Sequence, residues 1–254
     1  MERIRKPFQG VTNIIRFNWH FYLLSVIIIL FLLAFASFIN SKFRFVIFVL
    51  CALAVLVNLI SLSVSFYIYD LSNLYSLHWL NKLIKNDVKS IANIHAGFDE
   101  TSELLHKKYP NATLHVFDFY DEKKHTEVSI KRARKAYPAF RNTKQVSTSS
   151  LPLPNNSVDV AFLIFAAHEI RNDIERIIFF KELRRILKDD GKIIVTEHLR
   201  NVPNFLAYNI GFFHFLPKLT WFKTFDSAGM KIDDKIKITP FISIYILTKN
   251  GNTY

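Results

Sequence analysis

Two long uncharged segments near the start of the chain limit what it can fold into more than any other feature. Residues 21–39 and 45–69 contain no charged side chain, and only five residues separate them. Each is long enough to cross a hydrocarbon layer about 30 Å thick as a helix that rises about 1.5 Å per residue. A signal peptide, the alternative, has an apolar region of only about 7–15 residues that ends in small residues. The two segments therefore predict a transmembrane helical hairpin over residues 21–69.

The basic residues around this hairpin predict its orientation. Four of them precede the first segment, namely Arg3, Arg5, Lys6 and Arg16. The connecting loop holds only two, and basic flanks tend to stay in the cytoplasm. Residues 1–20 are therefore expected in the cytoplasm, and two crossings return the chain to the same side. We expect an integral protein of the cytoplasmic (inner) membrane whose termini and whose domain at 70–254 face the cytoplasm.

The net charge limits the kinds of partner, and the cysteine content indicates the redox compartment. The formal net charge is +12, but the cations are scattered and no nucleic-acid recognition motif accompanies them. Anionic membrane lipids are therefore the expected partner, and nucleic acid is not. The single cysteine, Cys51, lies in the second apolar segment, which excludes a disulfide and suits a reducing compartment. Nothing in the sequence indicates the oligomeric state.

Short apolar segments alternate with helical ones after residue 70. Five strands are expected first, at 90–96, 112–119, 144–148, 157–166 and 192–199, and two more close the chain at 231–240 and 241–249. Helices are expected at 69–84, 100–108, 125–137, 171–188 and 218–228. The apolar face of the longest helix of this part is expected to comprise Ile174, Ile177, Ile178, Leu183, Ile186 and Leu187. This alternation predicts an α/β fold with a Rossmann-like, seven-stranded, mostly parallel sheet and helices on both faces.

Two runs in the middle of this region carry a family resemblance. "LPLPNNSVDVAFLIFAAHEI" (151–170) leads through the fourth strand, and "FFKELRRILKDDGKIIVTEH" (179–198) leads into the fifth. They resemble the "LPF-x-D-x-S-F-D" and "E-x-x-R-V-L-K-P-G-G" motifs of class I S-adenosylmethionine-dependent methyltransferases. The resemblance covers about residues 70–249. It implies S-adenosylmethionine as the cofactor and a small-molecule acceptor, with quinone and lipid methyltransferases as the expected relatives.

The turn after the first strand departs from the family's usual acid followed by G-x-G-x-G. Asn93 stands at the position of the acid, and His95, Gly97 and Asp99 stand at the three glycines. Gly97 keeps the position at which backbone and cofactor approach most closely. The resemblance implies that His95, Ala96 and Gly97 contact the cofactor. Turn geometry, with Asp99 capping the next helix, is the alternative.

The ends of the next strands supply the other expected cofactor contacts. Asp118 lies 21 positions after Gly97, close to the gap of about 20 residues at which a carboxylate meets ribose hydroxyls in dinucleotide folds. A carboxylate accepts hydrogen bonds from both hydroxyls. The resemblance places the adenine near Phe119 and Thr148. It also implies that Ser147 and Phe165 contact the cofactor.

Catalytic candidates lie in the turn after the fourth strand. His168 has a side chain that titrates near neutrality and is a candidate general base, with Glu169 orienting it. Methyl transfer also proceeds by alignment alone, so the pair is alternatively a pocket wall, as are Glu197 and His198. Convergence of four of the nine histidines, His95, His168, His198 and His214, on a metal ion is the alternative to separate loop or pocket histidines. Without an i, i+4 pair or an H-E-x-x-H motif, we expect separate histidines and no metal site.

The aromatic stretch at 204–222 covers the core or lies in the membrane interface as a lid that admits a lipophilic substrate. The sequence thus predicts a membrane-anchored S-adenosylmethionine-dependent methyltransferase acting on a small, lipophilic acceptor. A methyltransferase fold that has lost its cofactor and serves as an interaction module at the membrane is the alternative, supported by the incomplete glycine motif. A nicotinamide enzyme is disfavoured, because the six glycines of the chain supply no G-x-G-x-x-G.

Overall fold

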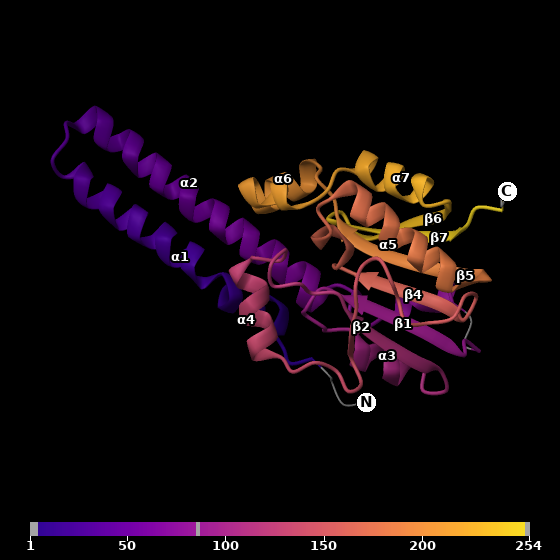
Figure 1. The fold of residues 1–254 in the computed structure, drawn as a ribbon. Coiled ribbons are helices and arrows are strands. Elements are labelled where there is room, and N and C mark those ends of the chain that lie inside the picture. The colour runs from indigo at the N-terminus through magenta and orange to yellow at the C-terminus, as the bar shows by residue number, and fades with distance from the viewer. Residues whose placement is uncertain (1–4, 85–86, 252–254) are drawn as a thin grey trace.

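The computed structural model of the protein describes residues 5–84 and 87–251; Arg3, counted above for the orientation, lies outside them. A helical hairpin of α1 (Gln9–Ala36) and α2 (Ser41–Phe66) projects from an α/β part formed by the rest of the chain (Figure 1). The two helices run side by side along their length.

Both hairpin helices are long and apolar enough to cross a membrane, by length and composition. The second span, counted from Ser41 to Leu71, contains the predicted segment 45–69, whereas α1 ends at Ala36 and leaves out the last three residues of the predicted segment 21–39. Only 6% of the most apolar window of each helix is buried inside the structure, whereas the core helix of a soluble protein is mostly buried. The exposed apolar surface of the hairpin is what a membrane-inserted pair would present.

Polar contacts fix the base of the hairpin to the α/β part. The Asp70 carboxylate accepts the backbone N–H groups of Gly10 and Val11 at 2.7 and 2.8 Å. These N–H groups lie in the first turn of α1, where a carboxylate stabilises the helix end. Glu100, in the turn after the first strand, accepts from the Arg5 guanidinium at 2.6 Å. The start of α1 is therefore tied both to the end of α2 and to the turn in which the cofactor contacts are predicted.

Helix α4 (Val128–Ala136) packs beside the base of α1 (Figure 1). The Arg132 guanidinium donates to the carbonyl oxygen of Phe17 at 2.7 Å, and the Tyr137 hydroxyl donates to the Asn13 side chain at 2.9 Å. This basic helix thus joins the hairpin to the edge of the sheet.

The sheet has seven strands in the order β3-β2-β1-β4-β5-β7-β6. In chain order they are β1 (Ser90–His95), β2 (Thr113–Asp118), β3 (Lys144–Gln145), β4 (Val158–Ile164), β5 (Leu187–His198), β6 (Met230–Thr239) and β7 (Ile242–Lys249). Strands β1 to β5 are parallel, and β7 is antiparallel to both β5 and β6. The Rossmann-like, mostly parallel sheet is therefore confirmed. Its strand order reverses between β1 and β4, and the crevice at the carboxyl ends there is where such sheets bind ligands.

Helices cover both faces of the sheet. On one face lie α5 (Asp173–Ile186) and α7 (Lys218–Ser227), whose aromatic rings share an apolar cluster with strand residues such as Leu163. On the other face lie α3 (Ser102–Lys108) and the segment after α2, which share a second cluster with Phe162. Neighbouring residues of β4 thus enter different clusters, as expected for an apolar strand buried on both faces.

The segment 69–84 does not form the predicted helix. It contains the end of a π-helical turn, Tyr67–Leu71, that continues α2, and a separate 3₁₀ turn at His78–Lys82. Leu77 has a left-handed backbone (φ 54°), which no helix continues through. Of the leucines that suggested a helix, Leu74, Leu77 and Leu80 are nevertheless buried against the sheet, whereas Leu71 is 62% exposed. The leucine spacing therefore indicates burial of these three residues and not a helix.

The predicted apolar face of α5 is also wrong in part. Ile174 and Ile178 are 70% and 41% exposed, whereas Arg176, Phe179 and Phe180 are fully buried. The helix ends at Ile186, and Leu187, expected on the helix, already belongs to β5 and pairs with β4. The "DDG" sequence therefore lies inside the strand and does not stop the helix.

Candidate active site

The turn after β1 is built around Gly97. Its backbone is left-handed (φ 92°), and a Cβ there would meet the Arg134 side chain and the Tyr120 ring at 3.0 Å. Glycine is therefore required by both conformation and space. The backbone N–H of Gly97 donates to His95 Nδ1 at 3.2 Å, so the imidazole two residues earlier lies against the turn.

Asp99 caps α3, as the alternative interpretation predicted. Its Oδ1 accepts the backbone N–H groups of Thr101 and Ser102 at 3.0 and 2.9 Å. Its other oxygen is buried without a hydrogen-bond partner and lies 3.8 Å from His95 Nε2, which is also buried and unpartnered. Burial lowers the pKa of His95 despite the nearby carboxylates, so the ring is neutral at pH 7. Two orphaned polar atoms thus lie beside the turn, where a ligand would satisfy them.

Asp118 ends β2 with its carboxylate almost fully buried. One oxygen accepts the backbone N–H of Tyr120 at 2.9 Å, and the other forms an ion pair with the Arg134 guanidinium. The guanidinium also lies 4.3 Å from the centre of the Tyr120 ring. Arg134 therefore lies across both Asp118 and Gly97, where the ribose of a nucleoside is predicted.

A cavity of 530 Å³ opens beside this ion pair. Its wall includes Phe119, Tyr120, Arg134, Ser147, Thr148 and Glu175. The Thr148 hydroxyl donates to Glu175 at 2.7 Å, and Lys124 pairs with the same carboxylate oxygen at 2.7 Å. The cavity thus has an aromatic side and a polar side, as a purine base requires.

These residues fit the nucleoside part of S-adenosylmethionine. Asp118 supplies a carboxylate for the ribose hydroxyls, Phe119 an aromatic wall, and Thr148 a hydroxyl for the adenine edge. Arg134 is the obstacle, and its side chain is about one-third exposed, so it is free to turn outward. The position of the cofactor stays a prediction, and Arg134 would have to turn outward for the ribose to reach Asp118.

Two other predicted cofactor residues lie away from this cavity wall. Ala96 is buried in the apolar cluster beneath α5 and α7. Phe165 stacks on His198 with ring centres 5.0 Å apart and has a left-handed backbone (φ 52°). Their contact with the cofactor stays a prediction.

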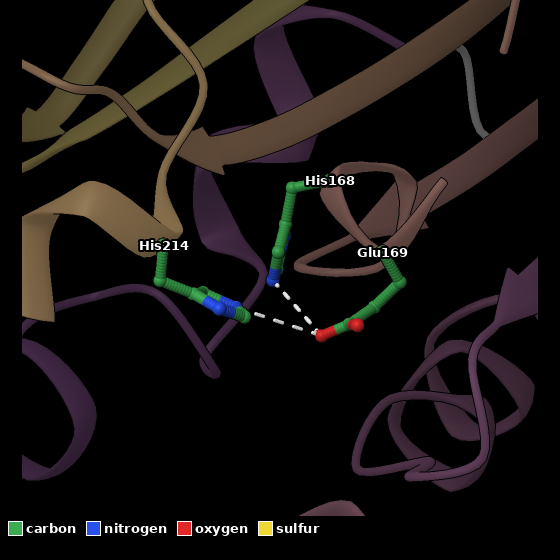
Figure 2. Close-up of side chains that lie close together, drawn as sticks. All are labelled: His168, Glu169 and His214. Carbon is green, nitrogen blue, oxygen red and sulfur yellow. Dashed lines mark ion pairs between the residues drawn. The ribbon is translucent and has the colours of Figure 1, made fainter. Parts of the chain in front are cut away.

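A second group of polar side chains surrounds Glu169. His168 and Glu169 belong to the 3₁₀ turn Ala167–Glu169 that follows β4. His214 ends the 3₁₀ turn Asn209–His214, which follows α6 (Val202–Tyr208). Figure 2 shows the two imidazoles and the carboxylate converging on one point. The expectation that the histidines lie apart is therefore wrong for this pair, whose ring centres are 4.9 Å apart.

Each of the two imidazoles has a carboxylate behind it. His168 Nδ1 lies 2.7 Å from Glu197 Oε2, and His214 Nδ1 lies 2.9 Å from Glu127 Oε1. The other ring nitrogens face one oxygen, Glu169 Oε1, at 3.3 Å from His168 Nε2 and 3.6 Å from His214 Nε2. Glu197 also accepts the backbone N–H of His168 at 3.1 Å, so this imidazole is fixed in orientation.

The carboxylates change the acid–base properties of this group. Burial disfavours the charged form of His168, but Glu197 and Glu169 outweigh burial and raise its pKa to about 10. Burial raises the pKa of Glu169, but hydrogen bonds and charge from His168 and His214 lower it well below its usual range. In the absence of another cation, His168 is thus an imidazolium at pH 7 and has no lone pair to accept a proton. This state does not support the predicted general base.

His198 has a structural role. Its Nε2 lies 2.9 Å from the Tyr69 hydroxyl, and its Nδ1 lies 3.3 Å from the Asn204 side chain. The ring is stacked between Phe165 and Phe215. Burial lowers its pKa to about 4, so the ring is neutral and joins the end of α2 to β5. Both Glu197 and His198 were predicted to form a pocket wall. Glu197 lies beside His168, whereas the ring nitrogens of His198 contact Tyr69 and Asn204.

Sequence patterns missed several residues of the two sites, namely Tyr120, Glu127, Arg134, Glu175 and His214 as a partner of Glu169. Two of these come from the basic segment around α4, where the only signal was a run of cations. His214 lies within the aromatic stretch 204–222, and a polar residue at that point was the one available indication.

The comparisons with known proteins agree with this geometry. Residues 96–195 match the family model described as a methyltransferase domain. This part of the chain therefore matches a methyltransferase domain, and the match implies S-adenosylmethionine as the cofactor. No match was found among curated proteins.

Solved structures show the same fold at low sequence identity. A SAM-dependent methyltransferase from Aquifex aeolicus has 16% identity and a TM-score of 0.50, over 71% of this chain and 94% of that one. A protein from Pyrococcus horikoshii has 13% identity and a TM-score of 0.52, over 70% and 89%. The cyclase SpnF, at 15% identity and a TM-score of 0.50 over 70% and 80%, also has this fold. The fold alone therefore does not establish methyl transfer.

Proposed function

We propose that the protein is a membrane-anchored S-adenosylmethionine-dependent methyltransferase whose acceptor is a small lipophilic molecule that arrives from the bilayer. The observation that carries this proposal is the segment 202–214, which begins beside the hairpin and ends in the polar cluster. It joins an exposed apolar surface to the candidate catalytic residues within one short stretch of chain.

The segment comprises α6 (Val202–Tyr208) and the 3₁₀ turn that follows it. Its large exposed apolar residues are Val202, Phe205, Leu206, Ile210 and Phe213, with exposed fractions from 46% to 83%. Helix α6 contacts α2, and Figure 1 shows it alongside the lower part of that helix. Such a segment beside a transmembrane helix is typical of an interfacial element. His214, at its inner end, meets the turn that carries His168.

Within this proposal the chain's own residues divide into two groups. Asp118 holds the ribose hydroxyls, and Phe119 and Thr148 flank the adenine once Arg134 has turned outward. When bound, S-adenosylmethionine supplies a methyl group on a positively charged sulfur. His168 and Glu169 orient the acceptor, because methyl transfer depends chiefly on alignment and on exclusion of water. The cytoplasmic side is the expected side for this domain.

A second candidate function rests on Arg134. Its guanidinium satisfies Asp118 and covers Gly97, and such an ion pair would also stabilise a domain that no longer binds a cofactor. The domain would then be a membrane-bound interaction module. Cofactor binding separates the two functions.

The test is calorimetric titration of the purified full-length protein, in lipid nanodiscs, with S-adenosylmethionine and with S-adenosylhomocysteine. We expect saturable binding of one equivalent, and transfer of a labelled methyl group from the cofactor to a component of a membrane lipid extract. Absence of binding at millimolar cofactor, in protein whose circular dichroism shows it to be folded, would favour the interaction module. Binding without transfer to any lipid fraction would refute the lipophilic acceptor only.

Replacing Arg134 with alanine should tighten cofactor binding about two- to fivefold. The Arg134–Asp118 pair must break before the ribose binds, and a partly exposed ion pair contributes up to about 1 kcal/mol. The measurement is the ratio of dissociation constants by calorimetry, with Lys135→Ala, an exposed cation on the same helix, as the control. Weaker binding of the Arg134 variant would show that the guanidinium contacts the cofactor instead of competing with it.

A fluorophore at position 210 should report contact with lipid. In a Cys51→Ala background, Ile210→Cys labelled with an environment-sensitive dye should be quenched by spin-labelled lipids in reconstituted vesicles. Ile174→Cys, at a site on α5 that is 70% exposed, is the matched control and should not be quenched, whereas Ile210 is 83% exposed. Equal quenching at the two positions would contradict an interfacial segment at 202–214.

A further inference from the structure

We propose that His168, Glu169 and His214 bind one divalent transition-metal ion. Their candidate ligand atoms lie within 4.8 Å of one another, and Figure 2 shows all three side chains directed to a common point. Tetrahedral coordination with bonds of about 2.0–2.2 Å places ligand atoms about 3.4 Å apart. The two distances to Glu169 Oε1, 3.3 and 3.6 Å, agree with this spacing. Small movement of His214 would bring the third ligand pair into the same range.

The outer hydrogen bonds are those of a metal site. In protein metal centres a ligating histidine donates its other ring N–H to a carboxylate, which fixes the tautomer and directs the free nitrogen to the ion. Both histidines have a carboxylate beside Nδ1, namely Glu197 for His168 and Glu127 for His214. The Arg171 guanidinium lies 2.7 Å from the same His214 nitrogen, so His214 donates to Glu127 only once Arg171 has turned away. An accidental pair of histidines has no reason to present two such carboxylates. Glu197 is fully buried and pairs with His168, whose positive charge a bound metal ion would replace.

The charges around the cluster favour a cation at its centre. Three carboxylates face the two imidazoles, and the one permanent cation that contacts the cluster among the described residues is Arg171. Its guanidinium lies 2.7 Å from His214 Nδ1 and 3.2 Å from His214 Nε2. Arg171 is 42% exposed and lies at the rim, so metal binding requires it to turn toward solvent.

The ligand set indicates the class of metal. Two imidazoles and one carboxylate suit zinc, iron, cobalt or manganese, whereas magnesium and calcium prefer oxygen ligands alone. Three protein ligands leave at least one position open, as in catalytic rather than structural sites. This position lies at the carboxyl ends of β4 and β5, beside the segment that carries His214. If the proposed methyltransferase function holds, an oxygen of the acceptor would occupy it and be polarised by the ion.

The test is a titration of the chelator-treated, full-length protein with Co²⁺ alone, without S-adenosylmethionine, followed by visible d–d absorption. We expect one equivalent to bind with the strong absorption of four- or five-coordinate cobalt, and Zn²⁺ to displace it. Glu169→Gln and His214→Gln should each abolish this absorption. Glu197→Gln should weaken binding about 10- to 100-fold, the usual cost of losing an outer hydrogen bond.

Two control variants separate the site from the rest of the surface. His78→Gln, at an exposed histidine outside the cluster, should leave the titration unchanged, and Arg171→Ala should strengthen binding by removing the competing cation. Circular dichroism confirms that each variant is folded. Absence of one-equivalent cobalt absorption in the parent protein would overturn the proposal, as would absorption that survives both Glu169→Gln and His214→Gln. Neither outcome depends on cofactor binding, so it leaves the methyltransferase proposal to its own test.

Discussion

Replacing Asp118 with asparagine should weaken binding of S-adenosylmethionine about 10- to 100-fold. Asp118 is 4% exposed and lies at the end of β2, where it pairs with Arg134 of the cavity wall. A buried carboxylate that accepts hydrogen bonds from two ribose hydroxyls contributes about 1.5–3 kcal/mol, and asparagine retains only one acceptor oxygen. Calorimetric titration with S-adenosylmethionine and S-adenosylhomocysteine measures the change.

The size of this loss depends on Arg134. In the parent protein Asp118→Asn also removes the ion pair that competes with the ribose, and this partly offsets the lost hydrogen bonds. In the Arg134→Ala background the offset is absent, so the loss should be larger than in the parent. The double-mutant comparison therefore measures the competition between Arg134 and the ribose directly.

Asp121→Asn is the matched control for Asp118→Asn. Asp121 lines the cavity, and its carboxylate accepts the backbone N–H of Lys123 at 2.9 Å. We expect its substitution to change cofactor affinity by less than twofold. If Asp121→Asn and Asp118→Asn had equal effects, the cavity would act through its overall charge, and the ribose contact assigned to Asp118 would be wrong.

The strand pattern and the position of Asp118 could be predicted from sequence because both depend on local order. A run such as residues 157–166 has no polar residue but Asp159 and Ser157, and it has few alternatives to a strand buried on both faces. Asp118 is expected at a strand end because the 21 positions between it and Gly97 accommodate one helix and the strand that follows. Both predictions use spacing along a single chain segment.

The polar cluster could not be predicted in this way. His168 and His214 are 46 positions apart and come together only because the turns after β4 and α6 meet. Arg134 reaches Asp118 because α4 packs against α1. Glu127 precedes α4, and the sequence has no signal that pairs it with His214. The same placement of α4 brings the two side chains together. These contacts depend on how the hairpin docks, for which the sequence has no periodic signal.

The hairpin and the cofactor turn are mechanically linked. Glu100 follows the helix-capping Asp99 and is held by Arg5 from the start of the chain and by Tyr75 from the segment after α2. A change in the angle between hairpin and domain would therefore move the turn at Gly97. The orientation of the hairpin and the shape of the turn at Gly97 are thus coupled through one carboxylate.

The largest stability loss is expected for Arg176→Ala, about 3–5 kcal/mol. This fully buried guanidinium donates to the Thr224 hydroxyl at 3.0 Å and to the Ile170 carbonyl at 2.8 Å, and it pairs with Asp173. Its removal leaves a buried carbonyl without a partner, which costs about 1–3 kcal/mol, and opens a cavity beside Trp221, which adds a similar amount. Denaturant unfolding followed by near-ultraviolet circular dichroism measures the loss.

Arg176 also positions the cluster, because Ile170 directly follows the turn that carries Glu169. Arg176→Lys should restore only part of the stability, since an ammonium group cannot reach Thr224 and Ile170 together as the planar guanidinium does. Lys181→Ala, at an exposed site on the same helix, should change the free energy of unfolding by less than about 0.5 kcal/mol. If the Arg176 variant were as stable as Lys181→Ala, the buried guanidinium would be dispensable to the fold. If it were unstable but bound cobalt as tightly as the parent, its role would be stability alone, without positioning of His168 and Glu169.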